Sequence, residues 1–290
     1  MRRLVAIAAC ALLASGAQAA PRERTDAPPL EPYKIILVGD STMAPHSGWG
    51  GAFCAHHVKS SVACLNAGRG GRSTRSYRQE GSWDIALAEA KVPGYRGTWV
   101  LIQFAHNDQS SKSERWTDET TEFPANLRRF VEEVRAAGAT PVLVTPLTRR
   151  EFREGKLHNT LASWSDQIRG VAKAMDVPLV DLNALSAAQA QEMGAETATK
   201  LAQVPPTPEE LAAARAGTTL RARGTDYENS LRLSQYRFCY DQCCRTSQHY
   251  CQPFCMPDWL VHFVIHYFSG AIGSRARARR GRVLARRAWR

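Results

Sequence analysis

The chain has 290 residues, of which 44% are hydrophobic and 22% charged, and its formal net charge is +11. This length is enough for one α/β domain with a sizeable core, or for one domain and an appendage. The charge does not indicate nucleic acid as a partner, because residues 225–290 hold eleven Arg against four acidic residues and the rest of the chain is closer to neutral.

The N-terminus has the pattern of a secretory signal peptide. Two arginines precede an apolar stretch at residues 4–14, and the small-residue sequence Ala17-Gln18-Ala19 follows it. An apolar stretch of this length is too short to span a membrane. We therefore expect a signal peptide at residues 1–19, a linker at 20–32, and a secreted or periplasmic protein without a membrane span.

Residues 33–226 alternate between short apolar runs and segments of helical periodicity. The predicted strands are 34–38, 61–65, 98–104, 140–145 and 177–182, and the predicted helices are 49–59, 124–137, 161–175 and 209–216. This alternation predicts one α/β domain, a three-layer α/β/α sandwich whose parallel sheet has a flavodoxin-like strand order. Ligands bind beyond the carboxyl ends of such strands, so the residues after each strand are candidates for a site.

Ser41 comes directly after the first predicted strand, in the sequence Gly-Asp-Ser-Thr. A serine hydroxyl needs a base to become a nucleophile, and acyl attack also needs hydrogen-bond donors for the oxyanion. Gly71 follows the second strand and lets a backbone N–H approach a ligand, and Asn107 follows the third strand with a side-chain amide. We expect the N–H groups of Ser41, Gly71 and Asn107 to surround one point. The alternative for Ser41 is a helix N-cap.

Three further residues at these strand ends have structural interpretations. Asp40 is expected to accept backbone N–H bonds and to fix the turn at the serine. Asp108 is expected to form hydrogen bonds within its loop. For His106, which follows a strand almost directly, we favour a structural role over that of a catalytic base.

The sequences GDST, GWG, GGRSTRSY and QFAHNDQ occur in this order. Together they resemble the motifs of the SGNH (GDSL-type) hydrolases, and over residues 34–226 the chain is most similar to the rhamnogalacturonan acetylesterases. The resemblance implies Ser41 as the nucleophile, with Gly71 and Asn107 completing the oxyanion hole. It also implies a secreted enzyme, with an acetylated pectic polysaccharide as its partner and no metal or cofactor. We expect a monomer.

The chain departs from this family at its last motif, D-x-x-H, in which the Asp orients the His that serves as base. Asp226 stands where the acid is expected, but Asn229 occupies the position of the histidine. An amide cannot accept the proton of the serine. The composition changes at the same point. We expect the tail, residues 227–290, to be either disordered or a gene artefact, such as a frameshift, a retained intron or an inserted element.

The tail also contains two alternative bases. His262 and His266 would lie on one face of a helix together with Asp258, which imitates an acid–base pair. A chance arrangement in an apolar segment is the interpretation that we prefer, since the spacing is not that of the family. Two other interpretations of the whole chain stay open: an esterase that acts on another ester, and a catalytically impaired relative that lacks the base.

Outside the predicted signal peptide, the cysteines fall into two groups, one in the predicted domain and one in the tail. Cys54 and Cys64 are predicted to form a local disulfide, whereas the spacing of the five tail cysteines disfavours a zinc site.

Six arginines follow predicted strands: Arg69, Arg72, Arg75, Arg149, Arg150 and Arg153. Their guanidinium groups either bind the carboxylates of a galacturonate backbone or pair with Glu80, Glu151 and Glu154, and the sequence leaves both roles open.

Overall fold

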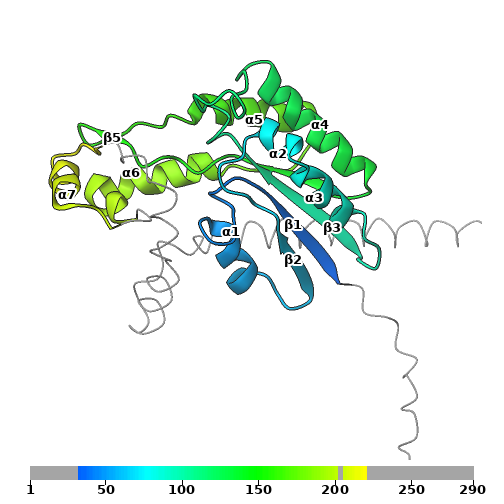
Figure 1. Cartoon of the computed structure of the whole chain (residues 1–290). Coiled ribbons are helices and arrows are strands. Elements are labelled where there is room, and N and C mark those ends of the chain that lie inside the picture. The colour runs from blue at the N-terminus through cyan, green and yellow to red at the C-terminus, as the bar shows by residue number, and fades with distance from the viewer. Residues whose placement is uncertain (1–31, 202–204, 221–290) are drawn as a thin grey trace, which may run out of the picture. The chain divides into compact units, whose positions relative to one another are not determined.

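The computed structural model describes residues 32–201 and 205–220 (Figure 1). The predicted signal peptide, the linker up to residue 31 and the tail lie outside the described residues. Asp226, Asn229, His262 and His266 therefore lie outside them as well.

A sheet of five parallel strands forms the centre of the described fold, in the order β2-β1-β3-β4-β7. The strands are β1 (Tyr33–Gly39), β2 (Val62–Asn66), β3 (Gly97–Gln103), β4 (Thr140–Val144) and β7 (Leu179–Val180). Counted among the parallel strands alone, this is the order 2-1-3-4-5 of flavodoxin-like sheets, as predicted. The first four strands match their predicted ranges closely, but β7 has only two residues because it pairs with β4 only there.

Helices follow the strands, and a short antiparallel hairpin precedes α5. The helices are α1 (Trp49–Ala52), the π-helix η1 (Phe53–His57), α2 (Thr74–Gln79), α3 (Ser82–Ala90), α4 (Glu122–Ala136), α5 (Ala162–Ala174), α6 (Leu182–Lys200) and α7 (Pro208–Arg215). The hairpin consists of β5 (Phe152–Arg153) and β6 (Lys156–Leu157). The predictions for α4, α5 and α7 are confirmed, the helix predicted at 49–59 is shorter and half π-helical, and α2, α3 and α6 were not predicted.

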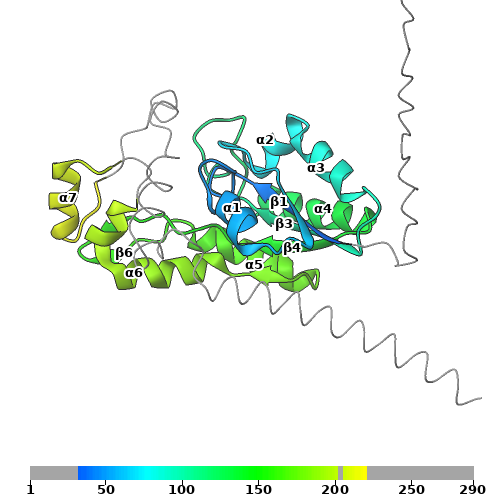
Figure 2. The ribbon, with the colours of Figure 1, turned by 90° about the horizontal axis from the view of Figure 1, so that it is seen from below.

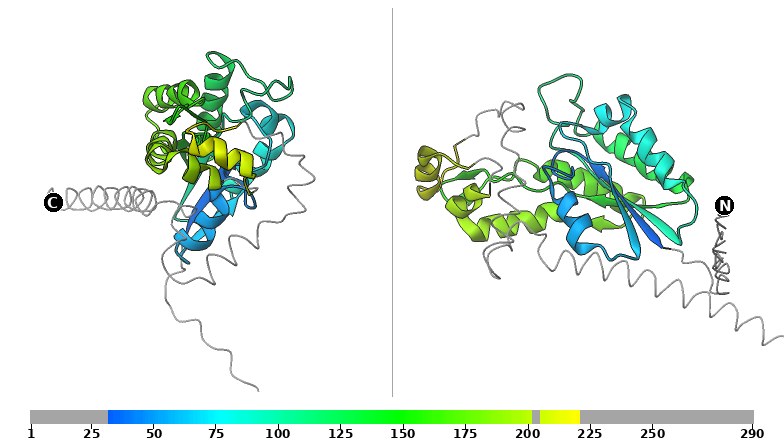
Figure 3. Two further views of the ribbon diagram at one scale, coloured as in Figure 1. Left: turned by 90° about the vertical axis from the view of Figure 1, so that its left-hand side faces the viewer. Right: turned by 60° about the horizontal axis from the view of Figure 1, so that its bottom comes forward.

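Side chains alternate between the two faces of the sheet, and each face is covered. On one face Ile36 and Val38 of β1 belong to a core cluster that includes residues of α2, α3, α4 and α5. On the other face Ile35 and Leu37 pack with Met43, with Phe53 of η1 and with the start of α6. Figures 1 and 3 show α2, α3 and α4 on the side of the sheet opposite to α1, and Figure 2 shows α5 and α6 from below.

A disulfide joins Cys54 in η1 to Cys64 in β2, with 5.5 Å between the two Cα atoms, and confirms the predicted pair. It ties the helical segment that follows the first strand to the neighbouring strand of the sheet. Within residues 32–201 and 205–220, no helix is long and apolar enough to cross a bilayer.

Candidate functional site

Ser41 lies on a tight turn at the carboxyl end of β1. The fully buried Asp40 forms this turn as predicted, since its Oδ1 accepts hydrogen bonds from the Thr42 N–H and the Thr42 hydroxyl, both at 2.8 Å. Its carbonyl oxygen accepts two further N–H groups, from Met43 and Ala44. The turn therefore provides hydrogen-bond acceptors for its own backbone N–H groups, and it holds Ser41 at the edge of the sheet.

A buried glutamine in β3 supports the turn from the neighbouring strand. The Gln103 side-chain amide donates to the Thr42 hydroxyl, and its Oε1 accepts the Trp49 indole N–H at 2.8 Å. Gln103 is fully buried, so both of its polar ends need these partners. Gln103 was not predicted as part of the site, although a lone glutamine in the apolar strand TWVLIQF indicates such a network.

The backbone of the segment that follows the turn packs directly against the backbone of the loop that carries Ser41, which we call the serine loop. The Trp49 N–H donates to the Thr42 carbonyl at 2.9 Å, and the Gly48 N–H donates to the Ala44 carbonyl at 3.0 Å. A Cβ on Gly48 would lie 2.1 Å from the Thr42 backbone, and a Cβ on Gly50 would lie 2.2 Å from the Met43 oxygen. Glycine is required at both positions because no side chain fits between the two segments.

The loop after β2 carries Gly71 and is bonded to the end of β1. The Arg69 N–H donates to the Gly39 carbonyl at 2.9 Å. Asn66 bridges the two loops, because its Nδ2 donates to the Met43 carbonyl at 2.9 Å while its Oδ1 accepts the Gly68 N–H. Gly71 itself has φ +77°, a conformation that side chains other than glycine rarely adopt.

The loop after β3 brings Asn107 to the same place. The buried Ala105 has φ +127°, which is unusual for a residue with a Cβ, and turns the chain sharply after the strand. Beyond it, the Asn107 side-chain amide donates to the Arg72 carbonyl at 3.0 Å. The segments that carry Ser41, Gly71 and Asn107 are thus joined by hydrogen bonds, at the edge of the sheet where the sequence analysis expected them to meet.

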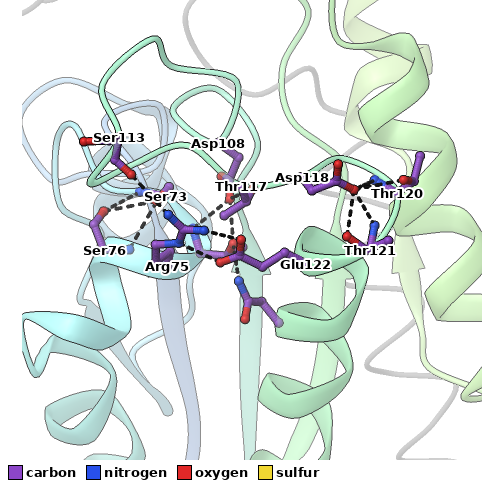
Figure 4. A network of polar contacts seen from close by, with 12 residues as sticks. Ser73, Arg75, Ser76, Asp108, Ser113, Thr117, Asp118, Thr120, Thr121 and Glu122 are labelled. Carbon is purple, nitrogen blue, oxygen red and sulfur yellow. Dashed lines mark hydrogen bonds and ion pairs between the residues drawn. The ribbon is translucent and has the colours of Figure 1, made fainter.

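Asp108 is a buried hub between α2 and the β3–α4 loop (Figure 4). Its Oδ1 accepts the Thr117 hydroxyl at 3.1 Å, which confirms the predicted hydrogen bonding within the loop. The same oxygen accepts the Thr74 N–H at 3.0 Å and the Thr74 hydroxyl at 2.5 Å, two bonds to α2 that were not predicted. Burial raises the pKa of Asp108 to about 7, against the effect of these hydrogen bonds.

The Ser41 hydroxyl has no hydrogen-bond partner among the residues that the structure describes. The His106 imidazole lies at the end of β3, hydrogen-bonded to the backbone of Leu147, with its Nε2 atom buried. Burial lowers the pKa of His106, so its ring is neutral at pH 7. In the described part of the chain, no group of three or more His, Cys, Asp or Glu side chains is arranged to hold a metal ion.

Most of the arginines after the strands have structural partners. Arg69 and Arg72 pair with Glu80, as one of the two predicted roles requires. Arg75 pairs instead with Glu122 at the start of α4, which was not predicted. Arg149 donates to the His106 carbonyl at 3.1 Å and to the Gln109 side chain at 2.9 Å.

Comparison with known proteins places these features in a family. The model of the GDSL-like Lipase/Acylhydrolase family matches residues 37–224. Rhamnogalacturonan acetylesterase RhgT of Bacillus subtilis is 36% identical over 179 residues, which cover 59% of this chain and 74% of that protein. Rhamnogalacturonan acetylesterase of Emericella nidulans is 30% identical over 184 residues, covering 56% of this chain and 72% of that protein.

A solved structure shows the same fold. The crystal structure of protein YxiM from Bacillus subtilis superposes with a TM-score of 0.52 and 25% sequence identity over 65% of this chain. The chain spans little more than half of that solved chain, 56%.

Proposed function

Since the chain belongs to the GDSL-like lipase/acylhydrolase family and is an ester hydrolase, we propose that it is a secreted serine carbohydrate esterase that removes acetyl groups from a pectic polysaccharide. The observation that carries the proposal is the hydrogen-bonded junction of the loops bearing Ser41, Gly71 and Asn107. The names of the two rhamnogalacturonan acetylesterases support the acetyl group and the pectic polymer.

In the proposed reaction, the Ser41 hydroxyl attacks the acetyl carbonyl and forms a tetrahedral intermediate. The N–H groups of Ser41 and Gly71 and the side-chain amide of Asn107 stabilise its oxyanion, and removal of one such donor typically costs about 100- to 1000-fold in kcat. One N–H of the Asn107 amide is bonded to the Arg72 carbonyl, and the second is available for the oxyanion. The sugar oxygen leaves with a proton, and water then releases acetate from Ser41.

In our proposal, the general base that accepts the proton of Ser41 lies outside the residues that the structure describes. Asp226 is the candidate for the residue that orients it, and His262 and His266 are the candidate bases. Two observations favour a second function, that of a catalytically impaired relative: Asn229 stands in place of the motif histidine, and no described side chain hydrogen-bonds the Ser41 hydroxyl. Replacing both histidines with alanine in one variant tests them, since full activity of that variant would exclude both as the base.

Secretion is part of the proposal and has two supports. The first 19 residues have the pattern of a signal peptide. The disulfide between Cys54 and Cys64 is of the kind that persists in oxidising compartments.

The proposal is tested by acetate release from acetylated pectin, measured beside hydrolysis of short and long aryl esters with the full chain. Ser41→Ala removes the proposed nucleophile, and Ser163→Ala, an exposed serine of α5, is the matched control. Acetate release that survives in Ser163→Ala and is lost in Ser41→Ala supports the proposal. Preference for long-chain esters would favour a lipase, and folded protein that hydrolyses no ester would favour the impaired relative.

A further inference from the structure

One short segment of the loop between β3 and α4 is held by hydrogen bonds at both of its ends (Figure 4). Arg75, held by its ion pair with Glu122, donates to the Ser113 carbonyl at 3.1 Å. At the other end, the Thr117 N–H donates to the Asp108 carbonyl at 3.0 Å, and its hydroxyl donates to the Asp108 carboxylate. The segment from Ser113 to Thr117 is therefore held in place before any ligand binds.

Arg115, in the middle of this segment, lies against the backbone of Gly71. Atoms of its guanidinium group are 3.3 to 3.4 Å from the point that a Cβ on Gly71 would occupy. The N–H groups of Arg115 and Trp116 both donate to the Lys112 carbonyl at 3.0 Å, which forms the turn that presents the side chain. A positive charge is thus placed beside one of the proposed oxyanion donors.

The guanidinium group of Arg115 has no carboxylate partner in the described part of the chain. Its neighbours differ: Arg72 pairs with Glu80 and Arg75 pairs with Glu122. Arg115 is partly exposed, and a guanidinium group carries five N–H donors. A planar guanidinium fork in a fixed position suits bidentate binding of a carboxylate.

Trp116 is the next residue and exposes 47% of its surface. It is the one aromatic residue among the large hydrophobic side chains exposed in the described residues. An exposed tryptophan offers a flat apolar face with a polar N–H at its edge, and such a face can pack against a sugar ring. The charge of Arg115 and the ring of Trp116 are two independent features of the same short segment.

From these observations we propose that Arg115 and Trp116 form a substrate subsite for an acidic sugar. Arg115 binds the carboxylate of a uronic acid residue, and Trp116 packs against a sugar ring of the same polymer. The inference rests on the proposed function, because it assigns this specificity to the site at Ser41. It explains how the enzyme would distinguish an acidic acetylated polymer from a neutral one.

A binding experiment tests the subsite without any turnover. Ser41→Ala protein is titrated by calorimetry with non-acetylated oligogalacturonate and with neutral xylo-oligosaccharide. We expect the acidic ligand to bind more tightly, and we expect Arg115→Ala, added to Ser41→Ala, to weaken that binding about 10- to 100-fold, with Arg115→Lys in between. Arg128→Ala, which removes an exposed arginine of α4, is the matched control for charge and should bind like the parent.

Kinetics on three substrates then separate the subsite from the catalytic machinery. For Arg115→Ala and Trp116→Ala we expect kcat/KM to fall on acetylated pectin, mainly through KM, and to stay within about twofold on acetylated xylan and on a small aryl acetate. An equal loss on the aryl acetate would overturn the inference, because Arg115 would then act on the reacting group. Unchanged oligogalacturonate binding in Arg115→Ala would also overturn it, whereas absence of all turnover would count against the proposed function alone.

Discussion

A single methyl group at Gly50 should displace the loop that carries Ser41. Gly50 lies in α1 and is buried against this loop. A Cβ there would lie 2.2 Å from the Met43 carbonyl oxygen and 2.5 Å from Asn66 Nδ2. These two atoms form the 2.9 Å hydrogen bond that joins the serine loop to the loop of Gly71. Gly50→Ala therefore inserts a methyl group into that contact.

The cost follows from these distances. Ordinary contact of a Cβ begins at 3.4 Å, so the Met43 carbonyl must move by roughly 1 Å. Overpacking of this kind costs about 1 to 3 kcal/mol, and loss of the hydrogen bond adds about 1 kcal/mol. Replacement of a helical glycine with alanine stabilises the helix by up to about 1 kcal/mol, which offsets part of this cost. We expect the free energy of unfolding to fall by about 2 kcal/mol, and kcat/KM to fall by about 100-fold because the nucleophile is misplaced.

Gly170→Ala is the matched control, since this exposed glycine of α5 has nothing within 4 Å of its Cβ position. The same chemical change should there raise the free energy of unfolding by about 0.5 to 1 kcal/mol. Urea denaturation followed by tryptophan fluorescence measures both variants, and hydrolysis of an aryl acetate measures the activity. If Gly50→Ala is as stable and as active as Gly170→Ala, the close packing of α1 on the serine loop is not what positions Ser41.

Two further predictions concern the β3–α4 loop. Ala105→Gly should raise the free energy of unfolding by about 1 kcal/mol, because glycine adopts φ +127° without strain, and urea denaturation showing no gain would contradict this. Since the pKa of Asp108 is raised to about 7, the folded protein binds its proton more tightly than the unfolded chain, and the free energy of unfolding should fall as pH rises from about 4 to about 7. Asp108→Asn should remove that fall, and an equal pH dependence in both proteins would exclude Asp108 as its source.

The sheet could be predicted because its strands are continuous apolar runs, and the helices α4 and α5 because they bury an apolar stripe. The helix α6 was missed because it buries small or polar residues beyond its first turn, among them Ala190, Ala195 and Ala198, which leave little apolar periodicity in the sequence. The short helix α2 owes its start to a capping box between Ser73 and Ser76, a local feature that periodicity does not detect.

The candidate site residues were selected from the sequence by their positions at the strand ends. Ser41, Gly71 and Asn107 each follow a strand, and parallel strands place their carboxyl ends at one edge of the sheet. The positions of Gln103 and Arg115 could not be predicted in this way. They depend on contacts between segments far apart in the chain, such as the approach of the β3–α4 loop to Gly71.

Covalent labelling of Ser41 tests the central claim most directly. An aryl phosphonate forms a stable adduct with an activated serine, and peptide mass mapping locates that adduct after incubation with the full chain. The account predicts one phosphonate group on the peptide that contains Ser41 and none on Ser41→Ala protein. A label on another residue, or an unlabelled Ser41 under conditions in which the protein hydrolyses an aryl acetate, would contradict it.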